Sequence, residues 1–303
     1  MNQDQCPLCG SFHLKSFIKR SRVPVHQNLI SGSQREALDI TQGELNMVVC
    51  HNCSFIFNQS FDLSLLSYGE GYDNNQSCSP HFDSYLNKIV KDLVECQGVK
   101  NCTIVEVGCG KGDFLKKLVS YPDTNNVGYG FDPSYVGPMS ELGGKVQFHS
   151  CYYDESCTEI MADIVICRHV IEHVPDPLSI LRSVRAALIS SPKARVFFET
   201  PCVEWILRNR VIWDFFYEHC SLFNAESLKF AFRQAGFTIK NVNHIFDEQY
   251  LWLEASLAGK DATQPIVGET LKLTEDYAKN EKRLQDEWLL RLQKINIGGE
   301  KLA

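Results

Sequence analysis

The sequence lacks long apolar runs, an apolar leader and any excess of positive charge. No stretch approaches the roughly 18 consecutive apolar residues of a membrane-spanning helix. The polar start, MNQDQCPLCG, has no hydrophobic segment typical of a secretory signal. The net charge of −7 disfavours nucleic acid and anionic membrane surfaces as partners, because phosphate binding needs clustered Lys and Arg. We therefore expect a cytoplasmic globular protein with neither kind of partner.

Cysteine, in contrast, is abundant, with 13 residues. An odd, scattered set without a signal peptide indicates reduced thiols. Four of them form two C-x2-C pairs, Cys6 with Cys9 and Cys50 with Cys53. Two such pairs can surround one tetrahedral ion, so they predict a structural zinc site without an open coordination position. Buried free thiols are the alternative, and the spare ligands would be His13, His26 and His51.

The chain divides by pattern into four parts. Residues 1–60 carry both cysteine pairs and lack long helical periodicity. Residues 61–98 are a polar, Gly-rich loop followed by a helix that begins at Ser79-Pro80, with Ser79 as its N-cap. Residues 99–260 alternate strands with helices, which is typical of a parallel sheet covered on both faces. Residues 261–303 are a charged helical extension whose apolar stripe favours a packing surface.

The alternating part predicts five buried strands and a closing hairpin that adds an antiparallel edge. The strands are 103–107, 127–131, 145–148, 163–167 and 194–200, and the hairpin joins 237–246 to 249–257.

A Gly-rich turn, VGCGKGD, follows the first of these strands. Gly108, Gly110 and Gly112 would form a tight turn that lets main-chain amides approach a charged ligand. Asp132 ends the next strand, where a carboxylate can accept both ribose hydroxyls of an adenosine-containing cofactor. A Gly-x-Gly-x-Gly turn alone is a weak signal. Glu106, inside the first strand, distinguishes this pattern from the dinucleotide fingerprint.

Together these residues resemble the E/D-x-G-x-G-x-G pattern of class I S-adenosylmethionine (SAM) methyltransferases. The resemblance implies a Rossmann-like α/β sheet with helices on both faces, and it assigns Glu106 to the glycine loop and the methionine amino end. The segment RHVIEHVPDP resembles the motif that follows the fourth strand in small-molecule members. It implies that Arg168 and His169 lie beside the cofactor and His173 lies nearer the substrate. The candidates for the adenine side are Tyr152, Tyr153 and Asp154, with loop packing as the alternative for the tyrosines.

The order of the motifs over residues 5–260 resembles the zinc-containing nucleotide-sugar C-methyltransferases of deoxysugar biosynthesis. In that family the zinc is structural, a base removes a proton beside a keto group, and the enolate takes the methyl group from SAM. The resemblance assigns the base to His219 and contact with a sugar hydroxyl to Glu218. It implies that His173 polarises the acceptor and that Tyr68 or Tyr72 closes over it.

Two departures keep other interpretations open. The family often has Tyr where this chain has Phe216, with Tyr217 displaced by one position. The family also continues into a C-terminal α/β lobe that is absent after GGEKLA. Methyl transfer to carbon of a sugar or nucleotide-sugar is the expected function. The alternatives are transfer to oxygen or nitrogen of another small molecule, and a truncated non-catalytic protein that keeps the zinc and cofactor folds and serves as a partner or assembly module. For His219 itself the alternative is a core histidine capped by Glu218.

Overall fold

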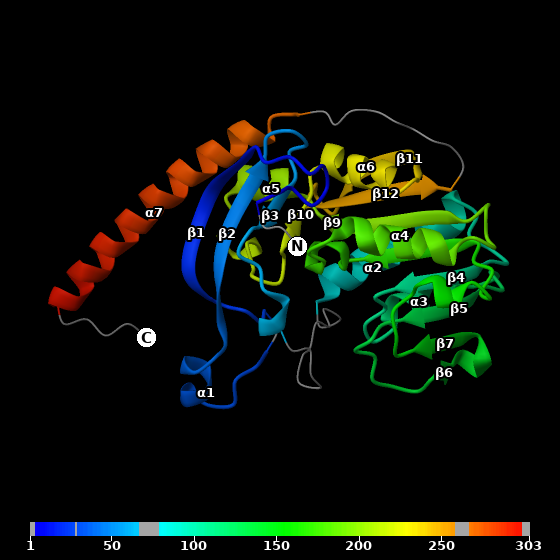
Figure 1. Cartoon of the computed structure of the whole chain (residues 1–303). Helices are drawn as coiled ribbons and strands as arrows, with labels where there is room; N and C mark the ends of the chain where they lie inside the picture. Colours follow the sequence, from blue (N-terminus) through cyan, green and yellow to red (C-terminus); the bar gives the residue numbers. More distant parts are fainter. Residues whose placement is uncertain (1–3, 28, 67–78, 258–266, 299–303) are drawn as a thin grey trace.

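The computed structural model describes residues 4–27, 29–66, 79–257 and 267–298, which form two sheets and their covering helices (Figure 1). The larger sheet has the order β11-β12-β9-β8-β4-β5-β7-β6, and the smaller sheet has the order β1-β2-β3-β10. The strands are β1 (Leu14–Pro24), β2 (Gln42–Cys50), β3 (Ile56–Asn58), β4 (Thr103–Val107), β5 (Val127–Phe131), β6 (Ser140–Glu141), β7 (Val146–His149), β8 (Ile164–Arg168), β9 (Arg195–Pro201), β10 (Ser221–Leu222), β11 (Thr238–Ile245) and β12 (Tyr250–Ser256).

Helices connect these strands and flank both sheets. The α-helices are α1 (Gln34–Leu38), α2 (Pro80–Lys91), α3 (Asp113–Val119), α4 (Pro177–Ala187), α5 (Val203–Asn209), α6 (Ala225–Gln234) and α7 (Thr270–Gly298). The π-helical segment η2 (Asp92–Cys96) extends α2, and the 3-10 turns are η1 (Leu63–Leu65), η3 (Leu142–Gly144), η4 (Glu155–Cys157), η5 (Ile171–His173) and η6 (Ile212–Asp214). Within the described residues, no helix has both the length and the apolar character needed to cross a membrane.

The centre of the larger sheet is parallel. Strand β4 pairs in parallel with β5 and β8, whereas β12 and β11 close one edge as an antiparallel hairpin. Val105 and Val107 of β4 pack in the core on the side of α4 and α6, while Ile104 packs on the side of α2 and α3. Alternate side chains of a strand point to opposite faces, so a strand buried on both faces reads as a continuous apolar run. The predicted α/β sheet with helices on both faces is confirmed.

The N-cap predicted for α2 is also confirmed. The Ser79 hydroxyl accepts a hydrogen bond from the Phe82 amide, and Pro80 occupies the first helical position, where its missing N–H costs nothing.

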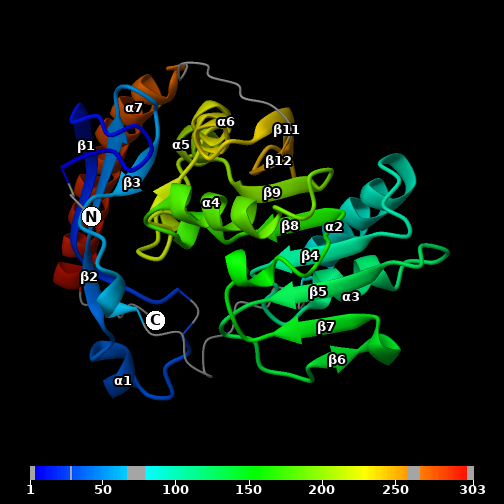
Figure 2. The same ribbon diagram turned by 45° about the vertical axis from the view of Figure 1, so that its right-hand side comes forward.

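The smaller sheet combines segments that are far apart in sequence. Strands β1 and β2 form a long antiparallel hairpin, and β10 pairs antiparallel with β3, with Ser221 opposite Phe57. Helix α7 runs along the side of this sheet that faces away from the larger one (Figures 1 and 2). Its Tyr277 is buried against the rings of Phe17 and Phe215. The division of the chain into four parts stays a proposal. Strand β10, from residues 99–260, pairs with β3, from residues 1–60.

Candidate active site

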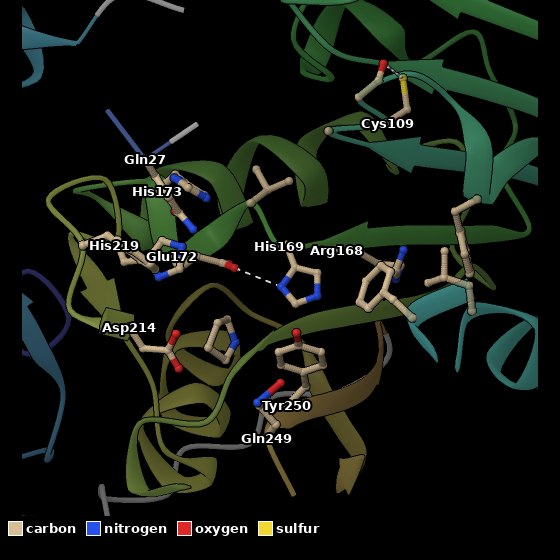
Figure 3. Close-up of a pocket in the computed structure, with 18 of the residues that line it drawn as sticks. Gln27, Cys109, Arg168, His169, Glu172, His173, Asp214, His219, Gln249 and Tyr250 are labelled. Atoms are coloured by element: carbon tan, nitrogen blue, oxygen red, sulfur yellow. Dashed lines mark hydrogen bonds and ion pairs between the residues drawn. The ribbon is translucent and has the colours of Figure 1, made fainter. Parts of the chain in front are cut away.

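A cavity of about 390 Å³ lies where β4, β5, β8 and β9 end, the edge at which open parallel sheets bind ligands (Figure 3). The loops after β4, β5 and β8 supply Gly108 and Gly110, Asp132 and His169, respectively, and Pro201 is the last residue of β9. Residues that are distant in sequence therefore meet at one edge of the sheet.

The glycine loop after β4 is built on positive φ angles. Gly112 has a φ of 76°, and a Cβ atom there would overlap the ring of Phe148. The Gly110 amide donates a 2.9 Å hydrogen bond to Oδ2 of Asp132, whose Oδ1 accepts from the Ser134 amide and hydroxyl. Asp132 therefore ties the loop after β4 to the loop after β5.

Glu106 lies beneath this loop with its side chain in the protein interior. Glu106 is 3% exposed, and its Oε2 atom has no hydrogen-bond partner among the described residues. Burial raises the pKa of Glu106 to about 8, and the attraction of Arg168 only partly offsets this rise. A buried carboxyl group with an unpaired oxygen suits a ligand that brings its own positive donor.

Glu199, near the end of β9, gathers three donors although it is fully buried. Its oxygens lie 2.6 Å from Nε of Arg168, 2.9 Å from Nε2 of His169 and 2.6 Å from the Tyr85 hydroxyl. Burial alone would raise the pKa of Glu199, but the charges of Arg168 and His169 outweigh it and lower the value to about 2. The same attraction overcomes burial at His169 and raises its pKa to about 9. At neutral pH this network is therefore an anion held by two cations and a phenol.

A second group of side chains, from η5 and the segment before β10, lies at the other end of the cavity. The rings of His173 and His219 are 4.9 Å apart, and Phe216 packs edge-on against His219 at 5.3 Å. The buried Glu172 completes a cluster with the two histidines, in which one ligand atom of each lies within 4.8 Å of the others. Burial, and then the charge of His173, lower the pKa of His219 to about 3, so this imidazole is neutral at pH 7.

The model of a family described as "Methyltransferase domain" matches residues 81–242, more than half of the chain. The chain belongs to this family of SAM-dependent methyltransferases. C-methyltransferase NovU of Streptomyces niveus is 25% identical over 275 residues, covering 88% of this chain and 64% of that protein. The ubiquinone biosynthesis O-methyltransferase of Vibrio campbellii is 32% identical over 113 residues, covering 36% of this chain and 47% of that protein. The matches thus span less than two thirds of either relative.

Among solved structures, 1,6-didemethyltoxoflavin-N1-methyltransferase of Burkholderia thailandensis, with bound S-adenosylhomocysteine, superposes with a TM-score of 0.43 and 15% identity. That match covers 58% of this chain and 79% of the other.

Most residues that the sequence assigned to the methyltransferase site line the cavity. Glu106, Gly108, Gly110, Asp132, Arg168, His169, His173 and His219 all do so. Gly112, at the end of the glycine loop, lies against Phe148 and is not among the lining residues. Tyr68 and Tyr72 fall outside the described residues.

The three candidates for the adenine side occupy other positions. The ring of Tyr153 is buried 5.0 Å from that of Phe131, and Tyr152 is 74% exposed. The carboxylate of Asp154 caps η4 by accepting from the Ser156 amide. None of the three is among the described residues that line the cavity, and their adenine role stays a prediction.

Glu218 and Tyr217 are not among the described residues that line the cavity, and both contact the N-terminal part of the chain. Glu218 is fully buried, and its Oε2 accepts a 2.5 Å hydrogen bond from the main-chain amide of Gln27. The Tyr217 hydroxyl accepts from the Asp62 amide at 2.8 Å, whereas Phe216 lines the cavity. The one-residue displacement noted in the sequence thus puts the phenol in the smaller sheet and a phenyl ring at the site.

Several residues that line the cavity, and Glu199 that holds two of the lining residues, were not singled out from the sequence. Glu199 had a usable signal, because a Glu inside the apolar strand ARVFFET must find partners when it is buried. Glu172 stands between the two histidines of a motif that was recognised. Burial raises the pKa of Asp214 to about 6, yet its irregular segment carries no pattern that would reveal it. Gln27 had no signal, since it reaches the cavity from a loop after β1.

The four predicted metal ligands converge in the N-terminal part of the chain. Cys6 Sγ lies 3.6 Å from Cys53 Sγ, and Cys9 Sγ lies 3.5 Å from Cys50 Sγ. All four are free thiols whose sulfurs lie within 4.8 Å of one another, and no described histidine belongs to this group. A tetrahedral site with zinc–sulfur bonds of about 2.3 Å separates its sulfurs by about 3.8 Å, so the cluster has the size of such a site.

Proposed function

We propose that this protein transfers a methyl group from SAM to a carbon next to a keto group of a sugar or nucleotide-sugar, with His219 as the base. The observation that carries the proposal is the placement of a partly buried, neutral imidazole in the same cavity as the glycine loop and Asp132. A relative described as a C-methyltransferase, 25% identical over 88% of this chain, supports carbon as the methylated atom.

The residues at one end of the cavity fit SAM. Bound SAM supplies an electrophilic methyl group, so alignment with the acceptor is the main requirement. The unpaired Oε2 of Glu106 suits the ammonium group of the methionine moiety. A carboxylate has about four lone-pair positions, and the Gly110 amide and the Ser134 amide and hydroxyl fill three of those of Asp132, so it can still accept a ribose hydroxyl. Arg168 and His169, fixed by Glu199, lie between this end and the acceptor.

The histidines at the other end fit the removal of a proton from carbon. His219 is neutral at pH 7 and can accept the proton, while the carboxylate of Glu172 favours the imidazolium that forms. Burial favours the neutral acid, but the hydrogen bond and the charge of His169 outweigh it and keep the pKa of Glu172 below its usual value, so this carboxylate is charged. His173 would polarise the keto oxygen. A positioned base contributes about 10²–10⁴-fold to such a step.

We also propose that Cys6, Cys9, Cys50 and Cys53 hold a structural zinc ion. Their convergence supports this assignment, because four thiol ligands complete a tetrahedral site and leave no position for substrate. The zinc would hold the ends of the β1–β2 hairpin together and take no part in the chemistry.

A second candidate is methyl transfer to oxygen, which the 32% identity to O-methyltransferases over 113 residues favours. One experiment separates the two. The protein is incubated with methyl-13C-labelled SAM and a panel of nucleotide-linked 4-keto-deoxysugars, together with matched sugars in which the ketone is reduced to an alcohol. A new methyl signal coupled to a ring carbon of the keto-sugars supports the proposal. Methylation only on oxygen overturns carbon transfer, and no turnover with clear binding of S-adenosylhomocysteine favours a non-catalytic protein.

A further inference from the structure

The segment that carries His219 is held from the smaller sheet. Phe215 packs against Phe17 at 6.0 Å, and a Cβ atom at Gly43 would overlap the ring of Tyr217. The Cys220 carbonyl accepts from the Asn58 amide at 2.9 Å, just before β10 pairs with β3. In this segment Phe216 and His219 line the cavity, whereas the residues between and beside them contact the N-terminal part of the chain.

Glu218 contacts the loop that follows β1. Its carboxylate is fully buried, and Oε2 accepts the main-chain N–H of Gln27 at 2.5 Å. A buried carboxyl group needs such donors, and a short hydrogen bond defines the donor's position closely. Two residues earlier, Val25 is buried and its amide donates to the Thr41 carbonyl at 3.0 Å. The chain is thus fixed immediately before Gln27 and at Gln27 itself.

The side chain of Gln27 enters the cavity from this fixed loop. It lines the cavity together with His173 and His219, and in Figure 3 these three labels lie toward one side of the view while Cys109 of the glycine loop lies toward the other. Trp213 and Phe216 also line this cavity. A carboxamide in such surroundings can both donate to and accept from a hydroxyl or carbonyl group.

The side chain of Glu218 contacts the Gln27 main chain and not the neighbouring His219 side chain. The described residues contain no hydrogen bond between the side chains of Glu218 and His219, although the two are adjacent in sequence. Nδ1 of His219 and Oε1 of Glu218 are each buried without a partner in the described part of the chain. The carboxyl group of Glu218 is therefore placed to hold the main-chain amide of Gln27.

We propose that Gln27 binds the acceptor through a hydroxyl or carbonyl group, and that Glu218 is a positioning residue that acts through the Gln27 main chain. The first half rests on the proposed function, because it assumes an acceptor rich in such groups. The second half does not, because it concerns a contact within the chain. In this arrangement the N-terminal part of the protein supplies a residue of the acceptor site.

Steady-state kinetics with SAM and a 4-keto-deoxysugar nucleotide test both halves. Gln27→Ala is expected to raise the KM for the acceptor about tenfold, the usual effect of one lost hydrogen bond, while binding of S-adenosylhomocysteine changes less than about twofold. Gln147→Ala, at an exposed position on β7, is the matched control and should change neither value. An unchanged acceptor KM in Gln27→Ala would overturn the assignment of Gln27.

Two substitutions at Glu218 show whether this residue positions the Gln27 main chain or acts as an ionising partner of His219. Glu218→Ala removes the acceptor of the Gln27 amide and should raise the KM for the sugar as Gln27→Ala does. Glu218→Gln keeps an oxygen that accepts this N–H, so it should restore the KM and leave the pH profile of kcat/KM unchanged. If Glu218→Gln is as impaired as Glu218→Ala, and its pH profile shifts, Glu218 is an ionising partner of His219 and the proposal fails.

Amide hydrogen exchange of the Gln27 main chain gives a readout that needs no acceptor. Exchange should accelerate in Glu218→Ala and stay near the wild-type rate in Glu218→Gln, with thermal melting used to confirm that both variants are folded. Equal exchange in all three proteins would overturn the positioning role. If no sugar is turned over, the proposed function fails while this measurement still decides the contact.

Discussion

The rings of His173 and His219 meet nearly at right angles, with an interplanar angle of 84° and centroids 4.9 Å apart. A second imidazole at this distance disfavours a positive charge on His219, and burial disfavours it more strongly. Together they lower the pKa of His219 to about 3. The imidazole of His219 that lines the cavity is therefore uncharged throughout the neutral pH range.

Replacing His219 by Ala should separate chemistry from cofactor binding. The variant loses the proposed base, so methyl transfer should fall by about 10²–10⁴-fold. Binding of S-adenosylhomocysteine, measured by isothermal titration calorimetry, should persist, because the glycine loop and Asp132 lie in other loops. His244→Ala, on the exposed side of β11, is the control and should keep full activity. Turnover in His219→Ala within a few-fold of wild type would return this residue to a structural role.

Glu106 predicts that cofactor binding releases a proton. Its pKa is raised to about 8, so at pH 7 the empty protein holds a proton on this carboxyl group. A bound ammonium favours the carboxylate and lowers this pKa, and the proton then leaves. Affinity for S-adenosylhomocysteine should therefore rise between pH 6 and 7.5, by up to about tenfold per pH unit. The measurement is calorimetry at pH 7 in buffers of different ionisation enthalpy, with release of close to one proton expected.

Glu106→Gln serves as the control for this linkage. It cannot release the proton, so its binding enthalpy should be the same in all buffers after correction and its affinity should be weaker. Buffer-independent binding by the wild-type protein would mean that Glu106 does not meet the ammonium group.

The cysteine cluster predicts a fixed metal content. Purified protein should contain about one zinc ion per chain by plasma mass spectrometry, because four thiolates complete one tetrahedral site. Cys53→Ser should lose this zinc and unfold at lower temperature, since a structural ion contributes directly to folding. Cys96→Ser changes an exposed thiol outside the cluster and should retain both the zinc and the melting temperature. Full zinc content in Cys53→Ser would exclude the four-cysteine site.

Strands with a strong local signal were predictable from the sequence. Residues 103–107 and 127–131 coincide with β4 and β5, because both are short apolar runs bounded by turns. Strand β10 was not predictable, since its two residues form a strand only by pairing with β3, far away in the sequence. The hairpin of β1 and β2 was missed for a related reason. Much of β1 is exposed and polar, and its pairing partner lies beyond an intervening helix.

The residues of the candidate site likewise divide into those with a local sequence signal and those without one. Gly108, Gly110 and Asp132 belong to a local pattern whose chemistry follows from spacing, and all three line the cavity. Contacts made across the fold left no such pattern. The bond between Gln27 and Glu218 depends on how the loop after β1 packs against the segment before β10, 191 residues away in the sequence, and neither residue's neighbours in sequence indicate it.

Two glycines offer a test of what the cofactor loop requires of residue 112. Gly112 and Gly143 both have positive φ angles, 76° and 67°, so an alanine at either position costs about 1 kcal/mol in backbone strain. Only at position 112 would the new Cβ also overlap a side chain, Phe148, whereas nothing lies within 4 Å at position 143. Overpacking adds about 1–3 kcal/mol, so Gly112→Ala should destabilise the fold by roughly 2–4 kcal/mol and Gly143→Ala by about 1 kcal/mol. Urea unfolding measures both. Equal losses would mean that the loop needs glycine at this position only for its backbone angle and that Phe148 yields to the methyl group.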